Sequence, residues 1–140
     1  MKKMFVYGTL RMGMYNYEKY YKDYESFRGY GYVKGELHTL QGKVYPALTQ
    51  GGDMILGEIH EVPDEVQDAV DLMEGFFGEG RMENEYDKIV SEIYDADGQV
   101  MDRLPVYFFN LRNPKNSNLL GNVISCGDYV KYMEEKIGEQ

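Results

Sequence analysis

The stretch MFVYGTLRMGMYNYEKYY, residues 4–21, begins like a buried strand and ends like a helix. Residues 2–7 (KKMFVY) predict the first strand, which is apolar enough at its end to be central in a sheet. Residues 15–24 predict a helix, although their many tyrosines are weak helix formers. These tyrosines are expected to pack along the helix with exposed hydroxyls. Between the two lies YGTLRMG, residues 7–13, a glycine-containing turn that fits neither element.

The turn after this strand admits two interpretations. The backbone N–H groups of Tyr-Gly-Thr-Leu, residues 7–10, can point together into one concavity that suits a carboxylate or a phosphate. Gly8 would let the backbone come close to a ligand and adopt dihedral angles that other residues avoid. No Gly-Lys-Ser/Thr sequence follows, so the turn is not a phosphate-binding P-loop. A plain strand-to-loop turn stays open as the alternative.

Composition narrows the class of protein. The 140 residues fit a single domain, residues 1–140, which is long enough to bury a hydrophobic core. The formal net charge of -9 and the lack of a dense Lys/Arg cluster argue against nucleic-acid binding. No apolar run approaches the roughly 18 residues of a membrane span, so no membrane partner is expected. The one cysteine, Cys126, excludes an internal disulfide, fits a reducing cytoplasm and is expected to be a small buried residue.

Further along the chain, glycines recur among strand-forming residues. In residues 26–40 they suggest bulges or tight curvature, and residues 54–62 predict another strand. Residues 85–109 predict two strands joined by a hairpin at Asp97-Gly98, and residues 127–138 predict a short helix. Many curved strands with few helices indicate a small barrel-like α+β domain.

The clearest predicted helix covers residues 63–75 and carries a glutamate near its end. Its apolar stripe consists of Val66, Ala69, Val70 and Met73. Glu74 falls in the last turn at the edge of this stripe, where the partial negative charge of the helix C-terminus disfavours an ionised carboxylate. Asp71 and any burial would raise the pKa of Glu74 further, so that it could accept and return a proton near neutral pH. A solvated glutamate beside the stripe is the open alternative.

Five blocks spread over nearly the whole chain carry a resemblance to a known family. They are YGTLRMGMYN (7–16), VKGELHTLQGKVYPAL (33–48), ILGEIHEVPDEVQDAVDLMEG (55–75), PVYFF (105–109) and SCGDYVKY (125–132). Together, and in this order, they resemble the gamma-glutamylcyclotransferase-like family. The resemblance implies an α+β fold, a small closed or nearly closed mixed β-barrel with a few flanking helices and a cavity at one end.

The resemblance also implies a reaction and its residues. In that reaction a gamma-glutamyl amine or amide cyclises to 5-oxoproline and releases the amine, and no metal or organic cofactor is required. Glu74 matches the acid/base of the family. The backbone of Tyr7, Gly8, Thr9 and Leu10 matches the loop that holds the α-carboxylate of the substrate. The implied partner is a small gamma-glutamyl molecule, while the leaving amine and the oligomeric state stay open.

Several positions depart from the family pattern or leave a choice. The family often has Tyr-x-Arg shortly after Glu-Gly, whereas here the loop 76–85 intervenes and Tyr86-Asp87-Lys88 takes that place. Tyr86 is a candidate substrate contact, and Tyr107 points either toward a ligand or into the core. Three loop glutamates could compete for the role of base, although a mobile loop would hold a base poorly. They are Glu79, Glu83 and Glu85.

Two classes of function remain. The first is an enzyme, a gamma-glutamyl(amine) cyclotransferase in the cytoplasm. The second is a non-catalytic protein on the same fold that binds a carboxylate or amino acid. The presence of both the turn and Glu74 favours the enzyme, because a binding protein has little need of a carboxylate with a raised pKa. No metal site is expected, because His38 and His60 each lack a Cys or His partner at ligand spacing.

Overall fold

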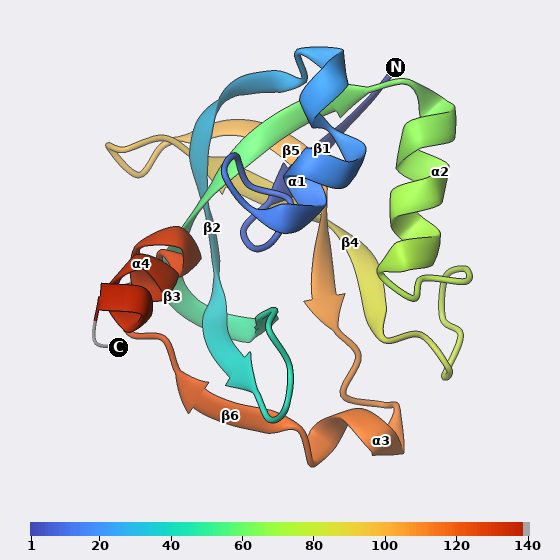
Figure 1. Ribbon diagram of the computed structural model, residues 1–140, viewed down its shortest axis with the longest axis vertical. Helices are drawn as coiled ribbons and strands as arrows, with labels where there is room; N and C mark the ends of the chain where they lie inside the picture. The colour runs from blue at the N-terminus through green and yellow to red at the C-terminus, as the bar shows by residue number, and fades with distance from the viewer. Residues whose placement is uncertain (139–140) are drawn as a thin grey trace.

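The computed structural model describes residues 1–138 and shows a strongly curved sheet with helices around it (Figure 1). The six strands in this range are β1 (Lys2–Val6), β2 (Phe27–Leu40), β3 (Ala47–Val62), β4 (Tyr86–Tyr94), β5 (Val100–Phe109) and β6 (Leu120–Val123). They pair antiparallel in the order β1-β3-β2-β4-β5, and β6 also pairs with β2. The outer strands β1 and β5 lie close together, so the sheet nearly closes on itself. The prediction of an α+β, nearly closed barrel is confirmed.

One of the two central strands is longer than the sequence pattern indicated. β3 begins at Ala47, although a strand was expected only over residues 54–62. Its register with β2 shifts between Gly35 and Glu36, and beyond that shift Glu36 pairs with Thr49. A Cβ atom on Gly35 would lie 2.7 Å from Leu48 Cδ1, so only glycine lets the two strands pack this closely. The curvature predicted for residues 26–40 is therefore observed in β2. It allows the first part of β3, which begins at Ala47, to pair with β2 as well.

The helices within residues 1–138 surround the sheet and vary in length. They are α1 (Tyr15–Tyr20), α2 (Asp64–Met73), α3 (Pro114–Ser117) and α4 (Tyr129–Gly138), and a 3-10 turn, η1 (Lys22–Tyr24), follows α1. The expected helix over 15–24 thus ends at Tyr20 and tightens into η1. In Figure 1, α2 and α4 lie on opposite sides of the barrel. No helix in this range is long and apolar enough to cross a membrane.

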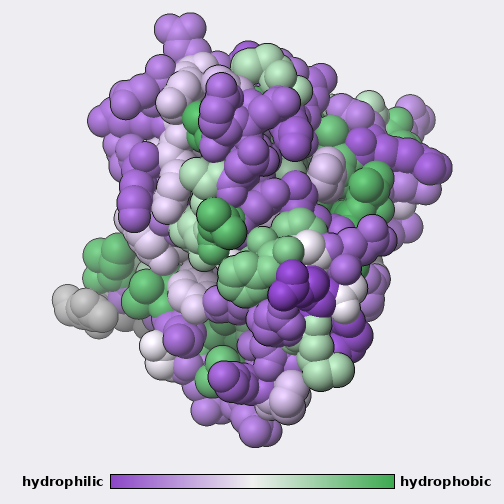
Figure 2. All heavy atoms as spheres, turned by 90° about the vertical axis from the view of Figure 1, so that its right-hand side faces the viewer, coloured by the Kyte–Doolittle hydropathy of each residue, from purple (hydrophilic) through white to green (hydrophobic). Residues whose placement is uncertain are grey.

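The ends of α2 agree with the sequence analysis. Pro63 occupies the N-cap, and Glu74 occupies the C-cap. Gly75 follows with φ +69°, the left-handed conformation in which glycine commonly ends a helix. α2 and the loop 76–85 are on the side of the molecule that faces the viewer in Figure 2, where hydrophilic side chains cover most of the surface. Both segments are therefore at the protein surface, close to the site described below.

Two expectations about individual side chains are wrong. Cys126 is exposed rather than buried, because it lies in the turn between β6 and α4. The tyrosines of residues 15–24 were expected to pack with exposed hydroxyls, yet Tyr21 is fully buried. Its hydroxyl donates to Gln67 Oε1 on α2 at 3.0 Å, which joins α1 to α2. A buried hydroxyl needs such an acceptor, and Gln67 supplies it.

Candidate active site

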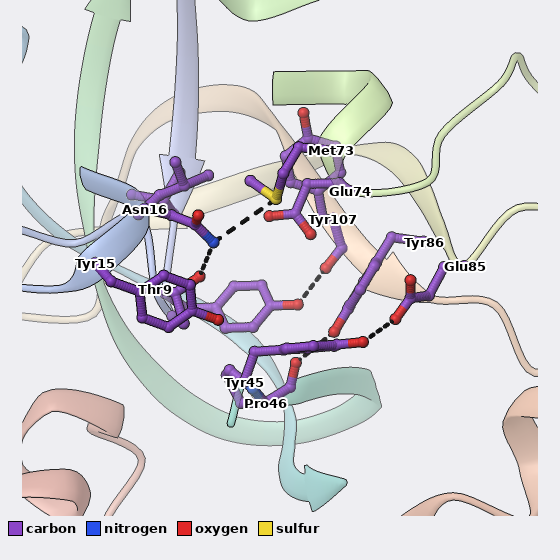
Figure 3. A pocket seen from close by; sticks show the side chains of 14 residues that line it. Thr9, Tyr15, Asn16, Tyr45, Pro46, Met73, Glu74, Glu85, Tyr86 and Tyr107 are labelled. Atoms are coloured by element: carbon purple, nitrogen blue, oxygen red, sulfur yellow. Dashed lines mark hydrogen bonds between the residues drawn. The ribbon is translucent and has the colours of Figure 1, made fainter. Parts of the chain in front are cut away.

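A cavity of about 240 Å³ lies between the turn after β1, the start of α1, the end of α2 and the start of β4 (Figure 3). Its lining residues are Val6, Tyr7, Gly8, Thr9, Leu10, Tyr15, Asn16, Tyr45, Pro46, Met73, Glu74, Glu85, Tyr86 and Tyr107. All seven residues predicted for the site line this one cavity, although up to 100 positions of sequence separate them. They are Tyr7, Gly8, Thr9, Leu10, Glu74, Tyr86 and Tyr107.

The turn after β1 is held by the residues that follow it. The carbonyl of Thr9 accepts the N–H groups of Asn16 and Tyr17, each at 3.1 Å. The Asn16 Nδ2 amide donates to Thr9 Oγ1 at 2.8 Å, so Asn16 helps to fix the turn. Within residues 1–138, the N–H groups of Gly8, Thr9 and Leu10 donate to none of the backbone hydrogen bonds of turns and loops. The three residues line the cavity, so their N–H groups are candidate donors to an anion there.

Gly8 is needed for close packing rather than for an unusual conformation. Its φ is not positive, which corrects the expectation that the turn uses dihedral angles closed to other residues. A Cβ atom at this position would lie 2.9 Å from Pro46 Cγ and 3.0 Å from Pro46 Cδ. A proline ring cannot move aside as a flexible side chain would. The turn therefore lies directly against Pro46, which forms another part of the cavity wall.

A buried polar network holds the far end of the same turn. Arg11 Nε donates to Glu58 Oε2 at 3.0 Å, and the Met12 N–H donates to Glu58 Oε1 at 2.9 Å. Glu58 Oε1 also lies 2.9 Å from His60 Nε2, and His60 Nδ1 lies 2.7 Å from Ser26 Oγ. Burial alone would raise the pKa of Glu58, but the hydrogen bonds from His60, Met12 and Arg11 outweigh it and hold the pKa below its ordinary value. The turn is thus anchored on β3.

Glu74 has the raised pKa that its position predicted. Its N–H bonds the carbonyl of Val70 at 2.9 Å, which continues the helical geometry to the C-cap and directs the side chain into the cavity (Figure 3). Burial, the charge of Glu85 and the charge of Asp71, in that order, raise the pKa of Glu74 to about 8. Glu74 is also only partly exposed and lines the cavity, so it is not a fully solvated glutamate beside the stripe. A group with this pKa is suited to accept and return a proton near neutral pH.

Glu85 is the second carboxylate of the cavity. In the sequence analysis it was only one of three loop glutamates that could compete with Glu74 for the role of base. Its N–H donates to the carbonyl of Gly75 at 3.0 Å, so the loop returns to the end of α2. Tyr45 donates its hydroxyl to Glu85 Oε1 at 2.6 Å (Figure 3). Glu85 is held at both its backbone and its side chain. Mobility of the loop is therefore no reason to exclude this residue as a base.

Buried asparagines hold the loop between Gly75 and Tyr86. Asn84 accepts the Phe77 N–H at 2.8 Å and donates to the Gly78 carbonyl at 2.8 Å. Asn116 donates to the carbonyl of Glu85 at 3.0 Å. The other two loop glutamates, Glu79 and Glu83, are exposed and do not line the cavity. Glu85 is therefore the only loop glutamate within the described residues that faces Glu74 across the cavity.

The predicted tyrosines build the walls, and their hydroxyl protons already have acceptors. Tyr7 donates to the carbonyl of Tyr107 at 2.5 Å, and Tyr86 donates to the carbonyl of Pro46 at 2.6 Å. Tyr107 lines the cavity, while its hydroxyl donates to the partly buried Asp71, so the hydroxyl already has a protein partner. Burial is the main cause that raises the pKa of all three tyrosines, which keeps them neutral near pH 7.

In the Tyr86-Asp87-Lys88 segment, the lysine contacts another protein side chain and not the cavity. Lys88 Nζ bonds Asp71 Oδ2 at 3.0 Å, and Lys88 is not a lining residue. Among residues 1–138, the only residues with a charged side chain in the lining are Glu74 and Glu85. An anionic group in this cavity would therefore be bound by backbone N–H groups and not by a basic side chain. Among residues 1–138, no cluster of His, Cys, Asp and Glu side chains is arranged to hold a metal ion.

Seven lining residues were not predicted as site residues: Val6, Tyr15, Asn16, Tyr45, Pro46, Met73 and Glu85. Tyr15 and Asn16 belong to the YGTLRMGMYN block, and Tyr45 and Pro46 belong to the VKGELHTLQGKVYPAL block, so the resemblance already covered these four residues. Nothing in the sequence distinguished Tyr15 from the neighbouring tyrosines as a lining residue. Tyr45 and Met73 reach the cavity only because β3 and α2 converge there.

Comparison with known proteins agrees with this geometry. Residues 4–131 match the family described as "Gamma-glutamyl cyclotransferase, AIG2-like". Over 107 residues the chain is 33% identical to gamma-L-glutamyl-butirosin B gamma-glutamyl cyclotransferase of Niallia circulans, which covers 76% of this chain and 67% of that protein.

Solved structures show the same fold at low sequence identity. An uncharacterized protein from Pyrococcus horikoshii has a TM-score of 0.69 and 19% identity, with 99% of this chain and 98% of that chain covered. An AIG2-like protein from Mus musculus has a TM-score of 0.60 and 20% identity, with 92% of this chain and 88% of that chain covered. The chain therefore belongs to the AIG2-like gamma-glutamyl cyclotransferase family and is an enzyme of the cyclotransferase class.

Proposed function

We propose that this chain converts a gamma-glutamyl amine or amide to 5-oxoproline and a free amine, with Glu74 as the general acid and base. The observation that carries the proposal is the meeting of two features in one cavity. One is a carboxyl group whose pKa is raised to about 8, and the other is a turn whose N–H groups are available to an anion. The reaction requires both features.

The turn would bind the α-carboxylate of the substrate. Backbone N–H groups of Gly8, Thr9 and Leu10 can serve as its donors, because no basic side chain lines the cavity. Fixing the α-carboxylate also limits where the α-amino group can lie relative to the side-chain carbonyl of the same glutamyl residue. Such pre-orientation is worth on the order of 7 kcal/mol or more in the best intramolecular reactions.

The proposed proton transfers leave Glu74 unchanged at the end of a turnover. The ionised Glu74 accepts a proton from the α-amino nitrogen as that nitrogen bonds to the γ-carbonyl carbon. The bond from this carbon to the leaving nitrogen then breaks, and Glu74 donates the proton to the leaving amine. The γ-lactam ring of 5-oxoproline and a free amine result. No water, metal or redox partner takes part in this balance.

The Niallia circulans relative supports the choice of substrate class. Its name assigns it a gamma-glutamyl compound, gamma-L-glutamyl-butirosin B, as substrate. The part shared with a gamma-glutamyl amine is the glutamyl head group, which the proposal places in the cavity. The leaving part differs between such compounds, so the relative supports the head group and the reaction only.

The proposal is tested by release of 5-oxoproline from three synthetic gamma-glutamyl amides, those of pentylamine, 1,4-diaminobutane and 4-aminobutanoate. We expect product with the wild-type protein and a loss of about 10²–10⁴-fold in kcat for Glu74→Gln. Glu79→Gln, an exposed carboxylate outside the cavity, is the matched control and should keep full activity. A fully active Glu74→Gln protein would move the base elsewhere. A folded wild-type protein that binds the amides without turnover would support a non-catalytic binding protein.

A further inference from the structure

We propose that Glu85 is a specificity-determining residue, whose carboxylate selects substrates with a second positive charge in the leaving amine. This inference rests on the function proposed above. It concerns the part of the substrate beyond the bond that breaks, about which the family match is silent.

The size and surroundings of the cavity place Glu85 on the path of the leaving group. The cavity of about 240 Å³ lies below the roughly 300–1,000 Å³ range of small-molecule sites, so it suits the glutamyl head group but little more. A second, more open hollow of about 550 Å³ borders it. Glu85 lines both the cavity and this hollow, and among the described residues it is the only one common to the two linings. A leaving group that extends from the cavity into the hollow passes Glu85.

One oxygen of the Glu85 carboxylate remains available for such a contact. Tyr45 donates to Oε1 at 2.6 Å and thereby holds the carboxylate in place. Within residues 1–138, Glu85 Oε2 accepts none of the side-chain hydrogen bonds. An ammonium group on the leaving part could donate to Oε2 without displacing Tyr45. Charge-assisted hydrogen bonds of this kind are stronger than neutral ones.

The other charges of the outer hollow set the expected order of substrates. Lys43, Lys115 and Glu83 line it with Glu85, and none of the three lines the inner cavity. All three residues are exposed, so solvent and salt screen their charges. Glu85 is less exposed than they are and is held by Tyr45. Its charge should therefore dominate the selection at the point where the leaving group emerges.

The test uses the three amides named above, because their leaving groups have equal length and end in a methyl, an ammonium or a carboxylate group. We expect kcat/KM to be about tenfold higher for the diaminobutane amide than for the pentylamine amide, and lowest for the 4-aminobutanoate amide. In Glu85→Gln the ratio of the first two should fall to about 1. Glu79→Gln, on the same loop but outside both hollows, should retain the wild-type ratio.

The ratio of kcat/KM between the diaminobutane and pentylamine amides separates the selection of leaving groups by Glu85 from other effects of Glu85→Gln. Glu85→Gln also changes the pKa of Glu74, but at one pH that change acts on all three substrates and cancels in the ratio. A ratio near 1 in the wild type, or an unchanged ratio in Glu85→Gln, would overturn the proposal while leaving the reaction intact. Failure of all three amides to yield 5-oxoproline would instead contradict the proposed function.

Discussion

Gly75 and Glu85 are in direct contact: the carbonyl of Gly75 accepts the Glu85 N–H at 3.0 Å, and a Cβ atom on Gly75 would lie 2.9 Å from Glu85 Cβ. This contact joins the end of α2 to the start of β4. Since Glu74 directly precedes Gly75, the contact also sets one carboxylate beside the other. The Glu-Gly pair therefore positions the charge that, after burial, contributes most to the raised pKa of Glu74.

Substitution of Gly75 should disturb both stability and the pKa of Glu74. Gly75→Ala places a side chain at φ +69° and against Glu85, which should lower the free energy of unfolding by about 1–3 kcal/mol. Gly98→Ala is the matched control, because Gly98 has φ +82° with no atom near a built Cβ. Both variants should lose stability in denaturant titrations, but only Gly75→Ala should change the pH dependence of activity. Equal pH profiles in the two variants would refute the positional role of Gly75.

The pH dependence of kcat/KM should report Glu74. A base must be ionised to accept a proton, so with the pentylamine amide kcat/KM should rise with pH through about 8. Glu85→Gln removes a negative neighbour, which should lower the pKa of Glu74 and move the rising limb to lower pH. The α-amino group of the substrate titrates identically in both proteins, so the difference between the profiles belongs to the enzyme. If the rising limb stays at the same pH in Glu85→Gln, Glu85 does not change the pKa of Glu74.

Glu74→Gln should make the protein more stable at high pH, even as it removes activity. The folded state holds the pKa of Glu74 near 8, above the value of 4.5 for an unperturbed glutamate. Stability from the neutral carboxyl is fully present below the unfolded pKa and is lost as pH rises through the folded pKa. Since glutamine stays neutral, the variant should gain a few kcal/mol over the wild type above pH 8 and much less at pH 4.5. A pH-independent difference in Tm would contradict this account.

The packing of Gly8 against Pro46 should matter for catalysis. In Gly8→Ala the new methyl group meets the proline ring at 2.9 Å, so the turn must move away from it. We expect kcat/KM to fall by about tenfold or more, because misplaced N–H donors no longer fix the substrate. Gly52→Ala is the control, since no atom lies within 4 Å of a Cβ built there. Equal activity in the two variants would show that the turn does not need its observed position.

Local sequence patterns were sufficient to predict those elements whose structure is determined by residues close together in the chain. The period of Val66, Val70 and Met73, with Gly75 after them, predicted α2 and its end to within two residues. Asp97 and Gly98 correctly marked the turn between β4 and β5. The turn of residues 7–10 and Glu74 were brought into one cavity by family resemblance, because no spacing along the chain could relate them.

Other features depend on contacts between distant segments and could not be predicted from local pattern. The first part of β3 forms only because the register shift near Gly35 lets Thr49 pair with Glu36. Tyr45 and Glu85 are 40 residues apart, and their hydrogen bond depends on the return of the loop to the end of α2. Cys126 was misjudged because its burial depends on how the turn after β6 faces, which its own chemistry does not determine.

The buried network under the turn also bears on how enzymes are recognised from geometry. Ser26, His60 and Glu58 are connected in the order of a serine hydrolase triad, with separations of 2.7 and 2.9 Å. Yet their exposed fractions are 2%, 0% and 2%, so no substrate can reach the hydroxyl. A fluorophosphonate, which modifies accessible activated serines, should leave Ser26 unlabelled in the folded protein. A search for catalytic templates by distance alone would select these three residues, which lack the route from solvent that a reactive serine needs.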